Sequence, residues 1–188
     1  MLYEPHAEMR LGKEATIPKF LELARDSAVI HVAAHSIVNA QTPSQSFILM
    51  APSAKDPGPL DARSLLTRLK LDHTRLVVLS ACSSAGGLPI GPEGVAPLVR
   101  SLIGARVPAV IGSLWNVDDA TTEELLVSFH RHYLQGRDAA IALQYAQRDL
   151  LHHNNPGLQS ALAWASFQLI GHGSSPFAPR PEHKEKPP

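Results

Sequence analysis

Three short, nearly continuous apolar runs constrain the fold of this chain more than any other feature. They span residues 28–34, 75–81 and 107–114. Runs of this length and composition are typical of strands that are buried on both faces of a sheet. Between and after them, apolar residues at helical spacing predict helices at residues 15–24, 61–70, 95–103, 120–135 and 140–150. Strands that alternate with helices predict an α/β fold, a mostly parallel sheet with helices on both faces.

Weaker patterns complete the expected organisation. Residues 47–50 are a shorter strand candidate, residues 52–59 have the composition of a turn-rich connection, and residues 164–170 alternate well enough to be a last strand. Beyond Gly171 the composition is typical of disorder. We therefore expect one domain over residues 12–171 and a disordered tail over residues 172–188, with neither an internal repeat nor a second domain.

Charge and composition exclude several functional classes. The 188 residues carry 17 basic and 17 acidic side chains, so the formal net charge is zero. Nucleic-acid and anionic-membrane surfaces need a clear basic excess, so we expect neither as a partner. No apolar run reaches the roughly 18 residues that span a bilayer, and the first residues show no apolar signal core. We therefore expect a cytoplasmic protein.

Polar residues follow the expected buried strands. His35 follows the first strand, the single cysteine, Cys82, follows the second, and residues 115–119 follow the third. Ligands and chemistry gather at the carboxyl ends of parallel strands. A free thiol has a pKa of about 8.5, and a nearby imidazole can stabilise the thiolate and protonate a leaving amine. The spacing of 47 positions also fits a caspase-type histidine and cysteine, so the sequence indicates a Cys-His pair.

Four ordered blocks resemble a known family. They are His31–His35, Leu79–Ser83, Glu93–Val95 with Leu98 and Arg100, and Ser113–Thr121. Together they resemble the CHAT domains, caspase-like peptidase modules that are related to separase and often follow TPR repeats. The resemblance covers about residues 12–171. It implies a caspase-like three-layer sandwich.

The resemblance also implies roles for individual residues. Cys82 is implied to be the nucleophile and His35 the general acid and base. The backbone N–H groups of Ser36 and Cys82 are implied to form an oxyanion hole, which stabilises charge as it develops. The family commonly has glycine where this chain has Ser36.

Three carboxylates are candidates for substrate binding. By the resemblance, Asp119 matches the position that reads a basic substrate side chain, and Asp118 is the second choice. Either aspartate is also a good N-cap for the helix expected from about residue 120. Glu93 is a further candidate, with a first-turn helix acid as the alternative.

Simpler interpretations apply to the same residues. A lone cysteine after an apolar strand is often an inert buried thiol, although the family pattern favours a nucleophile for Cys82. His31 and His35 have the His-x-x-x-His spacing, but on a strand they lie about 13 Å apart, too far to share a metal ion. We therefore interpret His31 as structural and expect neither a metal nor a cofactor.

Two functional hypotheses follow. The first is a cysteine endopeptidase that cleaves protein substrates after Arg or Lys. The second is a non-catalytic caspase-like interaction module, bound to a TPR-containing or other regulatory partner. Ser36 and the eleven residues that precede Gly12 motivate the second hypothesis, because the family domain usually begins with further strands. On that view the sheet lacks its N-terminal strands.

Overall fold

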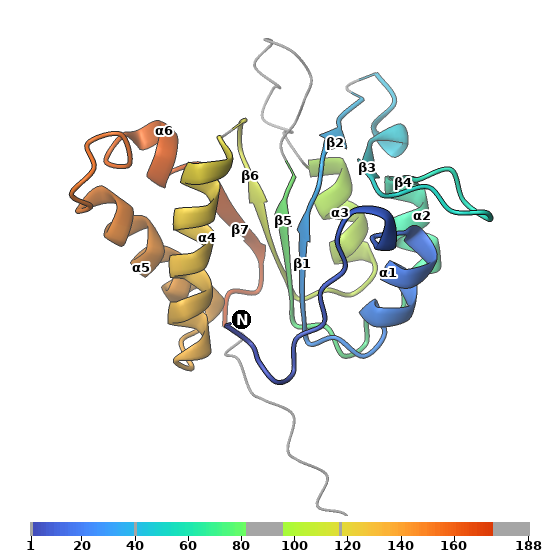
Figure 1. The fold of residues 1–188 in the computed structure, drawn as a ribbon, viewed down its shortest axis with the longest axis horizontal. Helices are drawn as coiled ribbons and strands as arrows, with labels where there is room; N and C mark the ends of the chain where they lie inside the picture. The colour runs from blue at the N-terminus through green and yellow to red at the C-terminus, as the bar shows by residue number, and fades with distance from the viewer. Residues whose placement is uncertain (1, 40, 82–95, 117, 175–188) are drawn as a thin grey trace, which may run out of the picture.

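A four-stranded sheet forms the centre of the molecule (Figure 1). The computed structural model describes residues 2–39, 41–81, 96–116 and 118–174. The strand order is β1-β5-β6-β7, and the strands are β1 (Val29–Ala33), β5 (Leu76–Ser80), β6 (Ala109–Ser113) and β7 (Phe167–Gly171). β1, β5 and β6 are parallel, and β7 is antiparallel to β6. The predicted α/β fold with a mostly parallel sheet is therefore confirmed.

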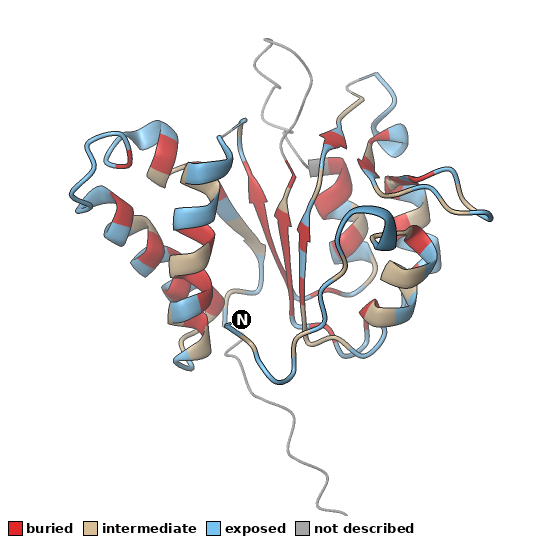
Figure 2. Ribbon diagram, viewed as in Figure 1, coloured by how far each residue is buried: buried red, intermediate tan, exposed pale blue. Residues whose placement is uncertain are grey.

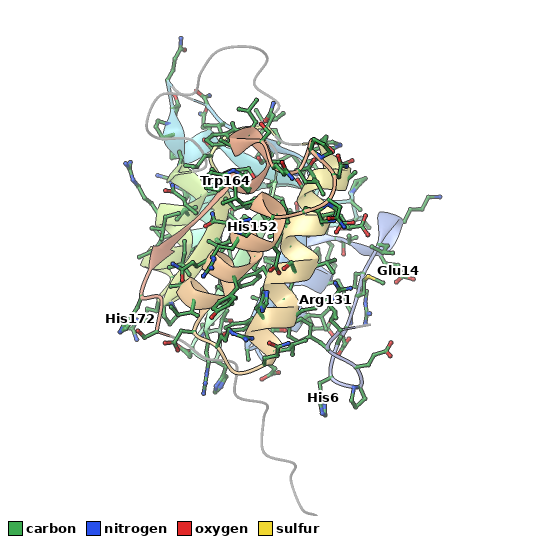
Figure 3. All side chains as sticks on the ribbon, turned by 90° about the vertical axis from the view of Figure 1, so that its left-hand side faces the viewer. His6, Glu14, Arg131, His152, Trp164 and His172 are labelled. Atoms are coloured by element: carbon green, nitrogen blue, oxygen red, sulfur yellow. The ribbon has the colours of Figure 1, made fainter. Side chains whose placement is uncertain are left out.

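Helices cover both faces of this sheet and complete a three-layer sandwich (Figure 1). One layer holds α1 (Ile17–Ala24), α2 (Ala62–Arg68) and α3 (Ala96–Gly104), and the other holds α4 (Asp119–Leu134), α5 (Ala139–Leu151) and α6 (Ala161–Trp164). Figure 3 views the second layer, with Arg131 on α4 and His152 just after α5. Short 3-10 helices lie at Gly12–Glu14 and Pro43–Gln45.

Alternation along β5 explains why two helical layers are needed. Val77 and Leu79 belong to the apolar core under α1–α3, whereas Leu76 and Val78 belong to the core under α4 and α5. All four side chains are at most 1% exposed. Because a strand directs successive side chains to opposite faces, β5 needs an apolar layer on each side. Figure 2 shows both cores as buried residues that flank the sheet.

A second, smaller sheet follows β1. It consists of β2 (Ser36–Ile37), β3 (Phe47–Leu49) and β4 (Pro59–Asp61) in antiparallel order. The sequence predicted only β3, because β2 and β4 are too short to show periodicity. Gly58 enters β4 with φ of 111°, and a Cβ there would lie 2.6 Å from the Met50 carbonyl oxygen. The tight approach of β4 to β3 therefore requires glycine at this position.

Side-chain caps begin several of the predicted helices, among them α2 and α4. The Asp61 carboxylate accepts a hydrogen bond from the Ser64 backbone N–H at 2.6 Å, as expected for the N-cap of α2. Asp118 caps α4 in the same way. No helix among the described residues is both long and apolar enough to cross a bilayer.

Two sequence predictions were wrong. The last strand begins at Phe167 rather than at residue 164, because the Ser160 side chain caps a short helix over Ala161–Trp164. The first apolar run was predicted to be buried on both faces, but His31 and Ala33 in β1 are exposed. β1 is an edge strand in the described sheet, so one of its faces is incompletely covered. Of the expected tail, residues 175–188 lie outside the described residues.

Candidate active site at the carboxyl ends of β1 and β5

The strands that precede His35 and Cys82 are direct neighbours. β1 and β5 pair in parallel, and Ala33, the last residue of β1, lies opposite Ser80, the last residue of β5. His35 and Cys82 each follow two positions later in the sequence. Cys82 and Glu93 lie outside the described residues.

His35 combines an anchored backbone with an exposed side chain. Its carbonyl oxygen accepts a hydrogen bond from the Leu49 N–H at 2.8 Å, which ties the end of β1 to the small sheet. The residue is exposed, and it lines a cavity of about 970 Å³. Solvent can therefore reach the His35 side chain, as a general acid and base requires.

Two serine hydroxyls converge on the peptide group just before Cys82. The Ser36 Oγ donates to the Ala81 carbonyl oxygen at 3.4 Å, and the Ser113 Oγ donates to the same oxygen at 3.3 Å. Ser36 is fully buried and Ser113 is 3% exposed. Ser36 thus uses its side chain to join the ends of β1 and β5, an interaction that glycine cannot make. The oxyanion role of its N–H stays a prediction.

Sequence reasoning did not identify Ser113 as a site residue. It ends β6, next to β5, and it stands first in the block Ser113–Thr121 that carried part of the family resemblance. A hydroxyl at the carboxyl end of the third buried strand was the available signal. The contact with Ala81 became evident only once the strand order was known.

Asp118 and Asp119 occupy different environments at the start of α4. The Asp118 carboxylate accepts a hydrogen bond from the Thr121 backbone N–H at 2.9 Å, and hydrogen bonds from Thr121 lower the pKa of this carboxyl. Asp119 is exposed and lines the same cavity as His35. The capping alternative is therefore confirmed for Asp118, whereas Asp119 is an exposed residue on the cavity that His35 also lines.

A chain of polar side chains begins at this cavity, which His31, Ser80 and His130 also line. Tyr3 Oη lies 2.7 Å from His130 Nδ1, His130 Nε2 lies 3.1 Å from His31 Nδ1, and His31 Nε2 lies 3.2 Å from Ser80 Oγ. Two assignments satisfy every contact: the donors run from Tyr3 through His130 and His31 to Ser80, or in the reverse direction from Ser80 to Tyr3. Both imidazoles are then neutral.

Electrostatics agree with this neutral assignment. Desolvation lowers the pKa of His130 to about 3, helped by repulsion from His31. Desolvation also lowers the pKa of His31, although part of that residue faces the cavity. Burial also raises the pKa of Tyr3, which keeps its hydroxyl protonated. No sequence pattern predicts the His31–His130 contact, because the two residues are 99 positions apart.

No group of three His, Cys, Asp or Glu side chains within the described ranges is arranged to hold a metal ion. His130 and His132, neighbours on α4, have separate partners: His132 Nε2 lies 2.7 Å from Asp149 Oδ2 on α5. The Trp115 indole N–H donates to the Leu162 carbonyl oxygen at 2.9 Å, so this side chain joins the end of β6 to α6.

The three-layer sandwich, with a histidine and a cysteine after neighbouring parallel strands, is consistent with the caspase-like class of proteins. The CHAT domain family model matches residues 1–172, so the chain belongs to the CHAT domain family, a family of caspase-like peptidases. No curated protein is similar enough to the chain to count as a match.

Proposed function

We propose that this chain is a cysteine endopeptidase in which Cys82 and His35 form the catalytic dyad. The supporting observation is the register of the sheet: the two residues follow neighbouring parallel strands, each two positions beyond the paired residues Ala33 and Ser80. Parallel strand ends of this kind bring side chains from distant parts of a sequence together at one edge of the sheet.

The proposed reaction proceeds through a thioester. The Cys82 thiolate attacks the scissile carbonyl carbon, and the resulting oxyanion accepts hydrogen bonds from the backbone N–H groups of Ser36 and Cys82. As the C–N bond breaks, the His35 imidazolium gives its proton to the leaving amine. His35 then takes a proton from water, which hydrolyses the thioester and releases the thiol.

We assign recognition of a basic substrate residue to Asp119. Its carboxylate lines the cavity that also reaches His35, so a guanidinium or ammonium group beside the scissile bond can approach it. Asp118 is the weaker candidate, because its carboxylate already caps α4. Glu93 remains a third candidate.

An arginine-based acyloxymethyl ketone tests the dyad directly. We expect this probe to label the folded protein at Cys82, and peptide mapping by mass spectrometry locates the adduct. His35→Ala is expected to slow labelling at least about tenfold, because the thiolate loses its neighbouring base. His152→Ala, which alters an exposed histidine after α5, is the matched control and should label at the wild-type rate. A folded protein that leaves Cys82 unlabelled would falsify the dyad.

The specificity assignment needs a comparison between the two aspartates. Asp119→Ala is expected to lower kcat/KM for substrates with Arg before the scissile bond at least tenfold, which corresponds to about 1.4 kcal/mol. Cleavage after an uncharged residue should change little. Asp118→Ala should instead cost about 1 kcal/mol of folding free energy, because it removes an N-cap. An equal loss on all substrates would remove Asp119 from the binding pocket.

The second candidate function is a non-catalytic caspase-like interaction module, with a TPR-containing or other regulatory protein as partner. The open edge of β1 favours this alternative, because an exposed strand edge can pair with another chain. Failure of the probe on folded protein, together with binding at that edge, would support it.

A further inference from the structure

The outward edge of β1 carries backbone groups that the described sheet does not use. The Arg75 and Leu76 N–H groups both donate to the Ala28 carbonyl oxygen, at 2.8 and 3.3 Å, so the backbone groups of residue 28 face β5. In a parallel ladder alternate residues point the same way. Ile30 and Val32 therefore face β5, and the N–H and C=O groups of Val29, His31 and Ala33 point away from the sheet.

Two helices extend past this edge and turn it into a groove. The cavity of about 970 Å³ runs along β1, with Phe20, Leu23 and Ala24 of α1 on one wall and Leu126 and Val127 of α4 on the other. Figure 1 shows α1 and α4 on opposite sides of β1. The groove thus offers hydrogen-bonding groups on its floor and apolar side chains on both walls.

The N-terminal segment crosses this groove without pairing with β1. It is held at its ends, where Tyr3 meets His130 and where the Ala15 carbonyl oxygen accepts from the Ala51 N–H at 2.9 Å. Figure 3 labels His6 and Glu14 on the stretch between. Within the described chain β1 pairs only with β5, and most residues of this segment are exposed. The segment forms part of the rim and leaves the strand edge open.

We propose that this groove binds an extended segment of another polypeptide, which adds to the sheet as a strand beside β1. The main chain of the incoming segment pairs with Val29, His31 and Ala33. Successive side chains of this segment point to opposite faces of the extended sheet. Apolar side chains on one face pack against α1, and those on the other face pack against α4. A segment that matches the five residues of β1 is about 17 Å long.

The charge at one end of the groove indicates which type of residue flanks the apolar stretch of the partner. Asp119 and Glu123 lie on the α4 wall near the carboxyl end of β1, both are exposed, and neither forms an ion pair within the described ranges. A basic residue beside the apolar stretch of the partner complements these carboxylates. The partner is therefore an apolar strand with a flanking Lys or Arg. This inference shares Asp119 with the substrate pocket of the proposed peptidase, but strand addition at β1 does not require Cys82.

A fluorescein-labelled peptide tests the proposal. Its core is Val-Ile-Val-Leu-Val-Ile with two lysines at each end, so that either strand direction brings a lysine to Asp119 and Glu123. N-methylation of alternate core residues blocks one edge and prevents the peptide from pairing with itself. The control peptide is N-methylated at all six core residues, which leaves no edge to pair. We expect saturable binding of the first peptide by fluorescence anisotropy, and at least tenfold weaker binding of the control.

Protein variants locate the binding site. Val127→Lys places a charge on the groove wall and should weaken peptide binding at least tenfold. Ile141→Lys changes an apolar residue on α5 that is 43% exposed and lies outside the groove, so its binding should match the wild type. Circular dichroism verifies that both variants fold.

Three outcomes would overturn the proposal. The first is that the one-edge peptide fails to bind folded protein, and the second is that both peptides bind equally well, since main-chain pairing is then not involved. The third comes from analytical ultracentrifugation: if the wild-type chain is a dimer and Val127→Lys is a monomer, the groove is filled by a second copy of this chain.

Discussion

β1 and β5 carry similar sequence patterns but occupy different positions in the molecule. Each is a five-residue strand rich in Val, Ile or Leu, and each precedes one member of the proposed dyad. β5 has a paired strand on each side and an apolar core on each face. β1 pairs only with β5 in the described sheet, and two of its five residues are exposed.

Because of this difference, the strand that precedes Cys82 is held by more contacts than the strand that precedes His35. The strand before Cys82 is fixed by packing and hydrogen bonding on every side, because it is central in the sheet. The strand before His35 is fixed on one side by β5 and at its end by the small sheet. Any segment that pairs with the open edge of β1 is therefore positioned to affect the histidine more than the cysteine.

Proline substitution should give the largest contrast between the strands. Val78→Pro removes an N–H from the central strand and should cost about 3 kcal/mol or more of unfolding free energy. Ala33→Pro removes an N–H that points away from the sheet and should cost about 1 kcal/mol, because edge strands tolerate proline. Urea denaturation monitored by circular dichroism measures both values. Similar losses would show that the outer edge of β1 is already paired.

Truncation of apolar side chains should give a contrast of similar size between the two strands. Leu79 in β5 is 1% exposed, so Leu79→Ala should destabilise the fold by about 3 kcal/mol. Val29 in β1 is half-buried, so Val29→Ala should cost less than about 1 kcal/mol. The two values are compared under the same denaturation conditions. If Val29→Ala costs as much as Leu79→Ala, β1 is covered in solution.

The free energy of unfolding should decrease as the pH falls, because His130 and His31 are neutral in the chain of contacts that leads to Ser80. The folded-state pKa of His130 is lowered to about 3, so its neutral form contributes stability that is fully present above the unfolded-state pKa of about 6.5. Each pH unit below 6.5 removes about 1.4 kcal/mol until the folded-state pKa is reached, which predicts a loss of about 2 kcal/mol at pH 5.

His130→Asn should flatten this dependence between pH 7 and pH 5, measured by urea denaturation at several pH values. His153→Asn alters an exposed histidine after α5 and should leave the slope as it is in the wild type. A wild-type stability that is constant over this range would contradict the neutral assignment of the His31–His130 pair.

The smallest expected difference is the coupling energy between the two hydroxyls that join the strand ends. Ser36→Ala and Ser113→Ala should each cost about 1 kcal/mol, because each removes one hydrogen bond to the Ala81 carbonyl oxygen. The double variant should cost more than the sum, since both hydroxyl partners of that buried oxygen are then lost. A double-mutant cycle measures the difference. Strict additivity would mean that the two hydroxyls act independently.

The sequence predicted most of the secondary structure and the family, and it placed His35 and Cys82 after two buried strands. It did so because apolar periodicity and local signals such as the Asp61 cap act over a few residues, and such signals are readable without knowledge of the fold. The short strands β2 and β4 were missed because two or three residues carry no measurable periodicity.

The amino-acid sequence alone determined which residues form the three longer parallel strands, and therefore which residues stand at their carboxyl ends. Only the tertiary structure decided which strand is central and which is an edge, because an apolar run looks the same whether one or two strands pair with it. The Ser36–Ala81–Ser113 contact and the His31–His130 pair likewise depend on strand order and helix placement. These contacts join residues tens of positions apart, and chain folding alone brings such residues together.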